Sequence, residues 1–138
     1  MRIEEIMTPS VATIGVDDTL YQASLRMREH DVGVLPVMRG KDIVGIVSDR
    51  DIVLRGVAEG LSPMSSKIRG VMTEGVVTCH MEDTVETASE LMTEHKIRRL
   101  VIVNDDGRPT GMVSLGDLAT HVHNHEISWH VLEEVSVH

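Results

Sequence analysis

Aromatic residues are nearly missing from this chain of 138 residues, which contains no Phe, one Tyr and one Trp. The hydrophobic core must therefore be built mainly from Val, Ile, Leu and Met, and the chain offers little to stack on nucleic-acid bases. A net charge of −9 also argues against a broad surface for nucleic acid or anionic membrane. A ligand that carries phosphate would need locally placed cations and backbone N–H groups.

Cysteine and long apolar runs are equally scarce. Cys79 is the only cysteine, which excludes an intrachain disulfide and favours a reducing compartment. No apolar run is long enough to span a bilayer, and the first residues lack the apolar stretch of a secretory signal. The composition, 41% apolar and 25% charged, is typical of a globular protein. We therefore expect a cytoplasmic protein in which Cys79 is a core residue.

An internal repeat organises the sequence. Shifting the chain by 65 residues aligns its two halves, and the offset becomes 66 after an insertion near residues 105–107. One repeat has too little core to be stable alone, so we expect two similar units that pack together. The most informative positions of the first repeat, Gly45, Val47, Ser48 and Asp51, align with Gly111, Val113, Ser114 and Asp117 of the second.

Each repeat is predicted to run strand, helix, strand, strand, helix, from its apolar runs and helical spacing. In the helix at 49–57 we expect Ile52, Val53 and Val57 to face inward. The elements are expected at residues 11–14, 20–30, 34–38, 43–47 and 49–57, and at 76–79, 85–95, 99–103, 110–113 and 115–122.

The predicted fold class is therefore α+β, with two tandem β-α-β-β-α units. The units are expected to pack sheet to sheet with pseudo-twofold symmetry. We expect the first unit at residues 1–60, a linker at 61–70, the second unit at 71–122 and a His-rich tail at 123–138.

Two strand-to-helix turns combine a hydroxyl with a carboxylate: Ser48 with Asp51, and Ser114 with Asp117. This spacing is related to the capping box, in which a Ser caps a helix and an acidic residue caps back. A carboxylate can also accept hydrogen bonds from two vicinal hydroxyls, and N–H groups at a helix start favour phosphate. Capping and binding of a nucleotide ribose are both open at this point, and the two roles can coexist.

The repeat with these turns resembles a pair of CBS domains, also called a Bateman module, over residues 3 to about 122. The resemblance also includes Met7-Thr8-Pro9, the Val-Leu-Pro-Val run at 34–37 and the Arg-Arg-Leu-Val-Ile-Val run at 98–103. The chain is similar to the stand-alone bacterial members, which are not fused to an enzyme or channel. The resemblance implies a non-catalytic sensor that binds an adenosine ligand such as AMP, ADP or ATP in clefts between its two units.

The resemblance also implies which residues line the two clefts. Asp51 or Asp117 would bind the ribose hydroxyls, the neighbouring Ser would assist, and strands of the opposite unit would enclose the adenine. The first cleft would combine Ile46, Ser48 and Asp51 with Thr78, Ile97, Arg98 and Arg99. The second would combine Met112, Ser114 and Asp117 with Thr13, Val32, Gly33 and Val34.

The two clefts differ in positive charge, because Arg98-Arg99 aligns with Gly33-Val34. Arginine grips phosphate oxygens well, so the cleft of Asp51 is predicted to bind phosphorylated nucleotide more tightly than the cleft of Asp117. The structural alternative is that both arginines follow a helix end, where cations are favoured. Adjacent strand residues point to opposite faces, so we expect one of the two to reach a ligand.

Other functions are weighed against this one. His121 and His125 are four residues apart, and on a helix they could share a face and bind Zn²⁺, although no third ligand is fixed nearby. The alternative function is therefore a stress-linked structural or metal-binding dimer without a nucleotide ligand. The sequence contains no nucleophile–base pair, Gly-rich phosphate loop or metalloprotease motif, so no enzyme is predicted. The expected partners are a second copy of the chain and an unknown downstream protein, without nucleic acid or membrane.

Overall fold

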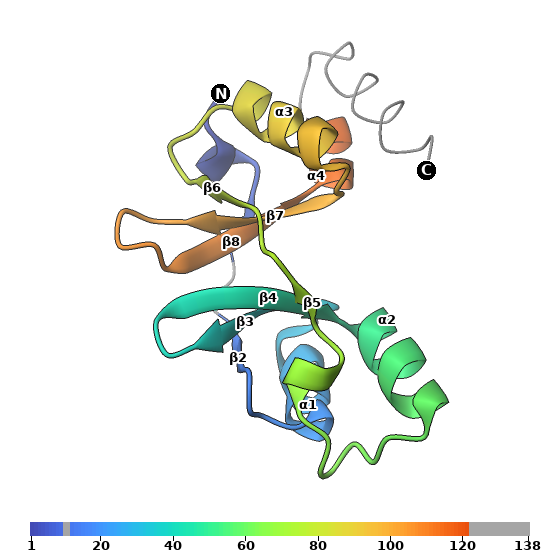
Figure 1. Ribbon diagram of the computed structural model, residues 1–138. Coiled ribbons are helices and arrows are strands. Elements are labelled where there is room, and N and C mark those ends of the chain that lie inside the picture. Colours follow the sequence, from blue (N-terminus) through green and yellow to red (C-terminus); the bar gives the residue numbers. More distant parts are fainter. Residues whose placement is uncertain (10–11, 122–138) are drawn as a thin grey trace. The chain divides into compact units, whose positions relative to one another are not determined.

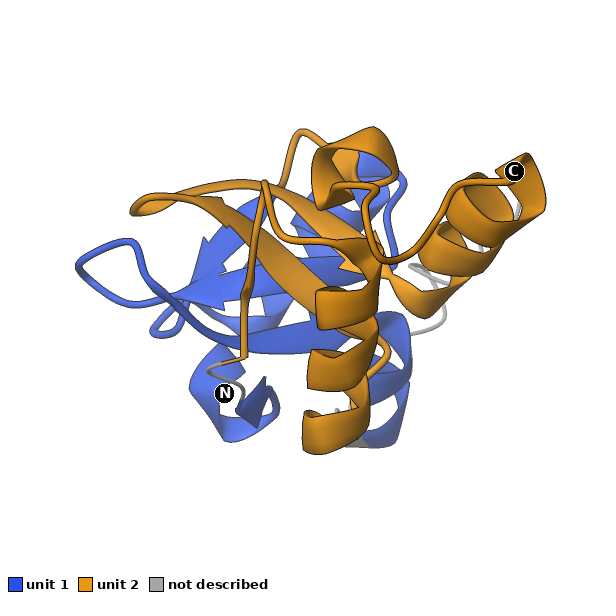
Figure 2. Ribbon diagram, turned by 90° about the horizontal axis from the view of Figure 1, so that it is seen from below, with its two compact units in different colours: residues 1–11, 77–138 blue, residues 12–76 orange. Residues whose placement is uncertain are grey.

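The computed structural model describes residues 1–9 and 12–121, and the α+β fold class is confirmed. The chain divides into two compact units, which Figure 2 colours separately. Unit 1 combines Met1–Val11 with Val77–His138, and unit 2 is Ala12–Val76. Unit 2 therefore contains the turn of Ser48 and Asp51, and unit 1 contains the turn of Ser114 and Asp117.

Unit 2 is a mixed sheet with helices on one face (Figure 1). The strand order is β2-β3-β4-β5, with β2 and β3 parallel and the other pairs antiparallel. The strands are β2 (Ile14–Gly15), β3 (Val34–Arg39), β4 (Asp42–Ser48) and β5 (Thr73–Glu74). The helical segments are α1 (Leu20–His30), the consecutive α2 (Asp49–Asp51), η2 (Ile52–Gly56) and η3 (Val57–Glu59), and η4 (Ile68–Gly70).

Unit 1 repeats this plan with the strand order β1-β8-β7-β6. Its β6 and β7 are parallel, and its other pairs are antiparallel. The strands are β1 (Thr8–Pro9), β6 (Thr78–His80), β7 (Arg99–Val103) and β8 (Pro109–Ser114). The helical segments are η1 (Ile3–Glu5), α3 (Val85–His95) and α4 (Leu115–His121).

The predicted bounds of the long helices α1 and α3 are confirmed, because their ends are specified locally. Thr19 caps α1 by accepting a hydrogen bond from the Gln22 N–H at 3.1 Å, and Thr84 caps α3 in the same way. Both helices end in a left-handed residue, Asp31 with φ 51° and Lys96 with φ 55°. Because α1 and α3 end in the same way, β3 and β7 begin at equivalent positions after them.

Each unit has its own hydrophobic core between its helices and its sheet. Alternate residues of β3 and β7 point toward the helices, as the strand period requires. The core of unit 2 includes Ile14, Leu20, Ala23, Met27, Leu35, Val37, Val47 and Ile52. The core of unit 1 includes Cys79, Val85, Ala88, Met92, Leu100, Ile102, Val113 and Leu118.

The lead-in segments exchange places between the repeats. Ile3, at the start of the first repeat, is fully buried in the core of unit 1, and its N–H donates to the Asp83 carbonyl at 2.8 Å. Ile68, at the equivalent place in the second repeat, is fully buried in unit 2, and its N–H donates to the Asp18 carbonyl at 2.8 Å. Each compact unit therefore needs a segment from the other repeat, which the repeat pattern does not reveal.

Two of the expected inward residues of helix 49–57 point outward. Ile52 is 7% exposed, whereas Val53 and Val57 are 54% and 56% exposed, so their expected placement in the core was wrong. The segment η2 is a π-helical turn, so the regular α-helical spacing behind the prediction does not hold over these residues. The strands β2 and β6 also begin later than predicted, at Ile14 and Thr78.

Candidate functional site

In unit 2, the candidate turn lies where β4 becomes α2. The Ser48 Oγ accepts a hydrogen bond from the Asp51 N–H at 3.0 Å, and Asp51 Oδ2 accepts one from the Ser48 N–H at 2.9 Å. The capping role of this motif is therefore present. The other oxygen, Asp51 Oδ1, lies 3.9 Å from Arg55 Nε, and this carboxylate is mostly buried.

In unit 1, the turn between β8 and α4 repeats this geometry. The Asp117 N–H donates to Ser114 Oγ at 3.0 Å, and the Ser114 N–H donates to Asp117 Oδ2 at 2.8 Å. Within the described residues, no hydrogen bond or ion pair engages Asp117 Oδ1. In each carboxylate Oδ2 accepts the capping hydrogen bond, and Oδ1 accepts no hydrogen bond within the described residues. Capping and ligand binding are therefore compatible at these turns.

The candidate strand residues lie on the sheet face opposite the helices. In unit 1, the register pairs Thr78 with Val101, and Val101 with Met112, so these residues share a row across three strands. In the same sheet Arg99 pairs with Ser114. Because directly paired residues point to the same face, Thr78, Arg99, Met112 and Ser114 lie on one side.

Unit 2 has the same arrangement. Val34 pairs with Ser48, and Pro36 pairs with Ile46, while the intervening Leu35 is buried in the helix-side core. The structure therefore places Ile46, Ser48 and Val34 on the face away from α1. In each unit, the candidate residues on the strands therefore share the sheet face opposite the helices.

The segment before β3 or β7 is tied to the turn of its own unit by one equivalent hydrogen bond. In unit 2 the Asp49 N–H donates to the Gly33 carbonyl at 2.9 Å. In unit 1 the Leu115 N–H donates to the Arg98 carbonyl at 2.8 Å. Arg98 and Arg99 are both exposed, as a role at a ligand requires.

Each predicted site residue can be assigned to one of the two units. Unit 2 holds Thr13, Val32, Gly33, Val34, Ile46, Ser48 and Asp51, and unit 1 holds Thr78, Ile97, Arg98, Arg99, Met112, Ser114 and Asp117. The grouping of residues from both units into two clefts stays a prediction.

Cys79 does not form a competing reactive centre. Cys79 is 3% exposed, and burial, aided by the Asp83 carboxylate at 3.3 Å, raises the pKa of its thiol to about 12. A thiol of this kind is a core residue rather than a nucleophile. Of the proposed metal ligands, His121 ends α4 and His125 belongs to the tail, and the side chains of both lie outside the described part of the chain.

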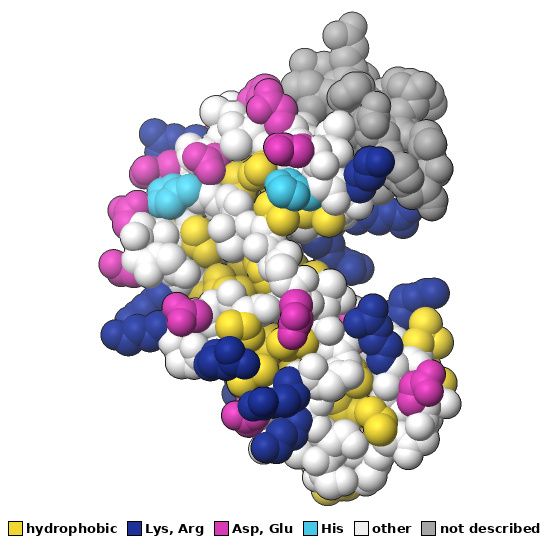
Figure 3. All heavy atoms as spheres, in the orientation of Figure 1, with side chains coloured by type: hydrophobic (Ala, Val, Ile, Leu, Met, Phe, Trp, Pro, Cys, Tyr) yellow, Lys and Arg dark blue, Asp and Glu magenta, His cyan; other side chains and the backbone are white. Residues whose placement is uncertain are grey.

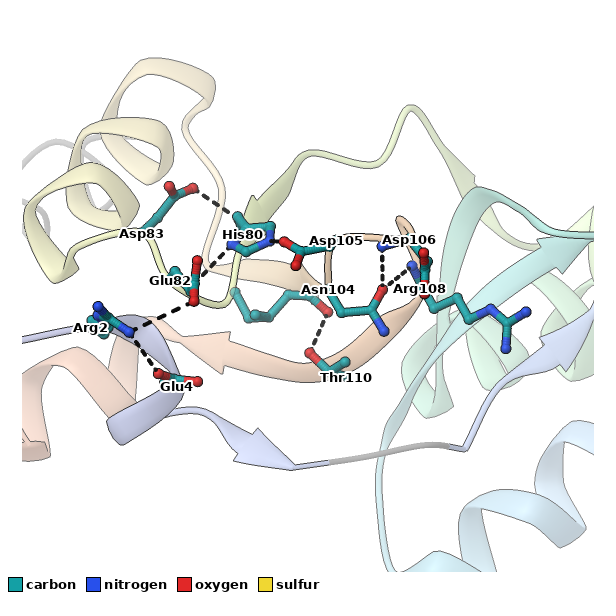
Figure 4. Close-up of polar contacts among 11 residues, drawn as sticks. Arg2, Glu4, His80, Glu82, Asp83, Asn104, Asp105, Asp106, Arg108 and Thr110 are labelled. Carbon is teal, nitrogen blue, oxygen red and sulfur yellow. Dashed lines mark hydrogen bonds and ion pairs between the residues drawn. The ribbon is translucent and has the colours of Figure 1, made fainter.

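One polar cluster of unit 1 was missed by the sequence reasoning (Figure 4). His80, Glu82 and Asp105 bring possible metal-ligating atoms within 4.8 Å of one another. However, His80 Nδ1 accepts the Glu82 N–H at 3.0 Å, while Nε2 lies 2.7 Å from Asp105 Oδ1. A neutral imidazole in this state carries its proton on Nε2 and donates it, so the cluster fits a hydrogen-bonded clamp better than a metal site. The His-x-Glu spacing alone could not reveal it, since Asp105 comes from the distant β7–β8 hairpin.

Apolar side chains are exposed along the helical segment 49–59 of unit 2. Val53, Leu54 and Val57 are 54%, 46% and 56% exposed, and hydrophobic and basic side chains lie side by side over this segment in Figure 3. Val53 and Leu54 also line a shallow cavity of about 330 Å³ with Asp49 and Arg50. The repeat counterparts of the two residues in α4 are Ala119 and Thr120, so this apolar surface is a feature of unit 2 rather than of the fold.

Comparisons with known proteins agree with this architecture. A family model described as CBS domain matches residues 3–57 and again 68–124. The CBS domain-containing protein YhcV of Bacillus subtilis (strain 168) is 36% identical over 134 residues, covering 97% of this chain and 94% of that protein.

Solved structures give the same result. The crystal structure of Hypoxic Response Protein I with two coordinated zinc ions has a TM-score of 0.73 and 30% identity, covering 88% of this chain and 99% of that one. The CBS domain pair of protein MJ0100, in complex with 5′-methylthioadenosine and S-adenosyl-L-methionine, has a TM-score of 0.72 and covers 87% and 94%. At 22% identity, this second likeness shows the fold alone. No helix in the described ranges has the length and apolarity needed to cross a membrane.

Proposed function

Because the chain belongs to the CBS-domain family and contains two copies of the domain, we propose that it is a non-catalytic regulatory module that binds an adenosine-containing ligand. The observation that carries the proposal is the duplicated turn. Two carboxylates, Asp51 and Asp117, are each held by a cap through Oδ2, and their Oδ1 atoms, of which that of Asp51 lies 3.9 Å from Arg55 Nε, would accept hydrogen bonds from ribose hydroxyls.

The ligand is proposed to bind between the two units, as the family resemblance implies. Asp51 or Asp117 would hold the ribose, and the apolar row that includes Ile46 or Met112 would contact the adenine. In this arrangement the ligand bridges elements of both units. Binding can then act as a signal if the ligand favours one arrangement or assembly of the protein over another.

Arg98 and Arg99 support AMP, ADP or ATP as the ligand of the site that uses Asp51. Both side chains are exposed, as contact with a phosphate requires. A guanidinium fork suits a phosphate group. We therefore propose that this site is the one for a phosphorylated nucleotide.

A homodimer is part of the proposal. The exposed Val53, Leu54 and Val57 form an apolar surface at helical spacing, which is the kind of surface that partner chains cover. Sedimentation or light scattering of the wild type and of Val53→Ser/Leu54→Ser would measure this part separately.

A thermal-shift screen tests the ligand proposal. The chain would be heated with AMP, ADP, ATP, adenosine, NAD and S-adenosylmethionine, beside the double variant Asp51→Asn/Asp117→Asn. Asparagine can still accept the capping N–H, but it loses the charge and one acceptor. We expect at least one adenosine compound to raise the Tm of the wild type and to lose this effect in the variant.

The matched control is Asp42→Asn/Asp106→Asn, which removes two exposed carboxylates from the hairpins of the same two repeats. The control should respond to ligand as the wild type does. The proposal fails if no adenosine compound shifts the wild type, or if the response survives in Asp51→Asn/Asp117→Asn.

Zinc supplies the second candidate, because Hypoxic Response Protein I, 30% identical, was crystallised with two coordinated zinc ions. In this chain the donors would come from the tail that contains His121 and His125. Calorimetry with Zn²⁺ on tag-free protein, beside His121→Ala/His125→Ala, measures it. Zinc binding without any adenosine response would favour this structural or metal-binding alternative.

A further inference from the structure

We infer that the shallow pocket on the helical segment 49–59 of unit 2 receives the side chain of Trp129 from a second copy of this chain. The inference rests on the homodimer of the proposed function, because it names the side chain that crosses between the two copies. It does not depend on the nucleotide. The pocket lies wholly within unit 2, and its occupant is identified from the sequence that follows α4.

The pocket brings three kinds of chemical group together on one short segment. Val53 and Leu54 supply apolar side chains, Asp49 supplies a carboxylate and Arg50 supplies a guanidinium. Its volume of about 330 Å³ lies at the lower end for ligand pockets, which span roughly 300–1,000 Å³, so it suits one large side chain. Val53 and Leu54 are 54% and 46% exposed, and covering them removes apolar surface from water.

The charged groups of the pocket can accept a further partner. Asp49 Oδ1 accepts a hydrogen bond from the Arg50 N–H at 2.8 Å. Within the described residues, no hydrogen bond or ion pair engages Asp49 Oδ2 or the guanidinium of Arg50. A group that has both an N–H donor and a π-face can therefore use the two together, because the N–H donates to the carboxylate and the face attracts the cation.

Tryptophan is the side chain that has all of these features. Its indole has a large apolar body, a face that attracts cations better than those of Tyr and Phe, and one N–H that takes a hydrogen-bond partner when buried. The chain contains no Phe and a single Trp, Trp129, which lies in the tail at 123–138. Trp129 is therefore the residue of this chain that matches the pocket.

The tail also complements the charge around the pocket. Residues 123–138 contain three Glu and no Lys or Arg, whereas the segment 49–59 exposes Arg50 and Arg55 beside its apolar side chains. Each copy has a net charge of −9, so two copies repel one another unless opposite charges meet locally. Such pairing also fixes which surfaces meet. The tail glutamates are Glu126, Glu133 and Glu134.

The described part of unit 1 has no equivalent pocket lining. The counterparts of the four pocket residues are Leu115, Gly116, Ala119 and Thr120. Leu115 is 9% exposed and packs into the core, and the other three offer neither a charge nor a large apolar side chain. Each copy therefore has one receiving pocket and one Trp129. A reciprocal exchange of the two between copies gives a closed twofold dimer.

The single Trp makes this contact measurable in the full chain. Acrylamide quenching of Trp129 and sedimentation are followed over a range of protein concentration, and acrylamide should reach Trp129 less as the dimer forms. Leu54→Asp and Arg50→Ala should each expose Trp129 and weaken the dimer about tenfold or more, because a few anchors carry most of the binding energy of an interface. Met64→Asp, at a side chain of the same unit that is 65% exposed, is the matched control and should change neither result.

A mixing experiment tests whether the contact crosses between copies. The Leu54→Asp chain has an intact tail and a damaged pocket, while the Trp129→Ala chain has an intact pocket and no Trp fluorescence. Mixing the two should protect Trp129 of the first chain from acrylamide, because the second chain offers its pocket. A mixture of Leu54→Asp with the double variant Leu54→Asp/Trp129→Ala is the control and should give no protection.

The outcomes separate the inference from the homodimer. If a dimer forms while acrylamide still reaches Trp129, or if Trp129→Ala leaves the dimer unchanged, the homodimer stands and the inference is overturned. If Trp129 is protected at every concentration and mixing changes nothing, the tail binds its own chain and the inference is also wrong. If the chain stays monomeric with Trp129 accessible, the homodimer and the inference fail together. Circular dichroism confirms that each variant is folded.

Discussion

The turns of unit 2 and unit 1 share their hydrogen bonds and differ in what surrounds them. Ser48 with Asp51, and Ser114 with Asp117, form reciprocal caps whose four bonds all measure 2.8–3.0 Å. Around the first turn stand Asp49 and Gly33, and around the second stand Leu115 and Arg98. The difference teaches that the repeat keeps the hydrogen bonds that hold the carboxylate, while the charge of the residues beside it differs between the units.

The largest expected effect comes from mutating the two lead-in segments in parallel. Ile3→Ala and Ile68→Ala each remove a fully buried side chain from equivalent places in unit 1 and unit 2. Each should lower the free energy of unfolding by about 2–5 kcal/mol, because a cavity remains in a packed core. Urea unfolding followed by circular dichroism measures it. Met64→Ala, at a side chain that is 65% exposed, is the control and should cost little.

A loss of similar size for Ile3→Ala and Ile68→Ala would confirm that both units depend on the exchanged segment. If Ile3→Ala lowers the free energy of unfolding as little as Met64→Ala does, the stability of unit 1 does not depend on its lead-in segment, and the proposed equivalence of the two units is wrong.

The arginine pair gives the next largest effect. Arg99→Ala should weaken AMP binding about tenfold and leave adenosine within twofold, because the proposed partner of the guanidinium is the phosphate, which adenosine lacks. Arg99→Lys should fall between, since a lysine keeps the charge without the planar fork. Calorimetry with both ligands provides the measurement. The assignment is wrong if Arg99→Ala has no effect while Asp117→Asn removes all tight AMP binding.

The smallest effect concerns pH. Cys79 occupies the strand position of Ile14 in the other repeat, and burial raises the pKa of its thiol from 9.0 to about 12. The folded state therefore holds the thiol proton more tightly than the unfolded chain does. This contribution to stability is complete below pH 9 and is lost as the pH rises toward 12. Unfolding free energies of wild type and Cys79→Ile should diverge over this window, and parallel curves would contradict the assignment.

Local signals explain what the sequence predicted well. The bounds of α1 and α3 follow from a Thr at each start and a left-handed residue at each end, which are readable without tertiary contacts. The apolar runs of β4 and β8 likewise placed Ser48 and Ser114 at strand ends. The sequence therefore predicted where both strand-to-helix turns lie.

Non-local contacts explain what it missed. A repeat shows that two segments are equivalent, but not which copy each one packs in, so the exchange of Ile3 and Ile68 was invisible. Val53 and Val57 lie in and directly after a π-helical turn, which regular α-helical spacing does not indicate. The clamp of His80 depends on Asp105, which the β7–β8 hairpin supplies.

The exchanged lead-ins also set an order for folding during synthesis. Unit 2 is one continuous stretch, Ala12–Val76, so all its strands are available once the ribosome has passed its end. Unit 1 needs Met1–Val11 to meet strands that follow Val77, and it cannot close until most of the chain has been made. The N-terminal segment must wait, with Ile3 and Ile6 exposed, while unit 2 forms. The long loop closure then falls late, which predicts that unit 1 is the slower half to fold.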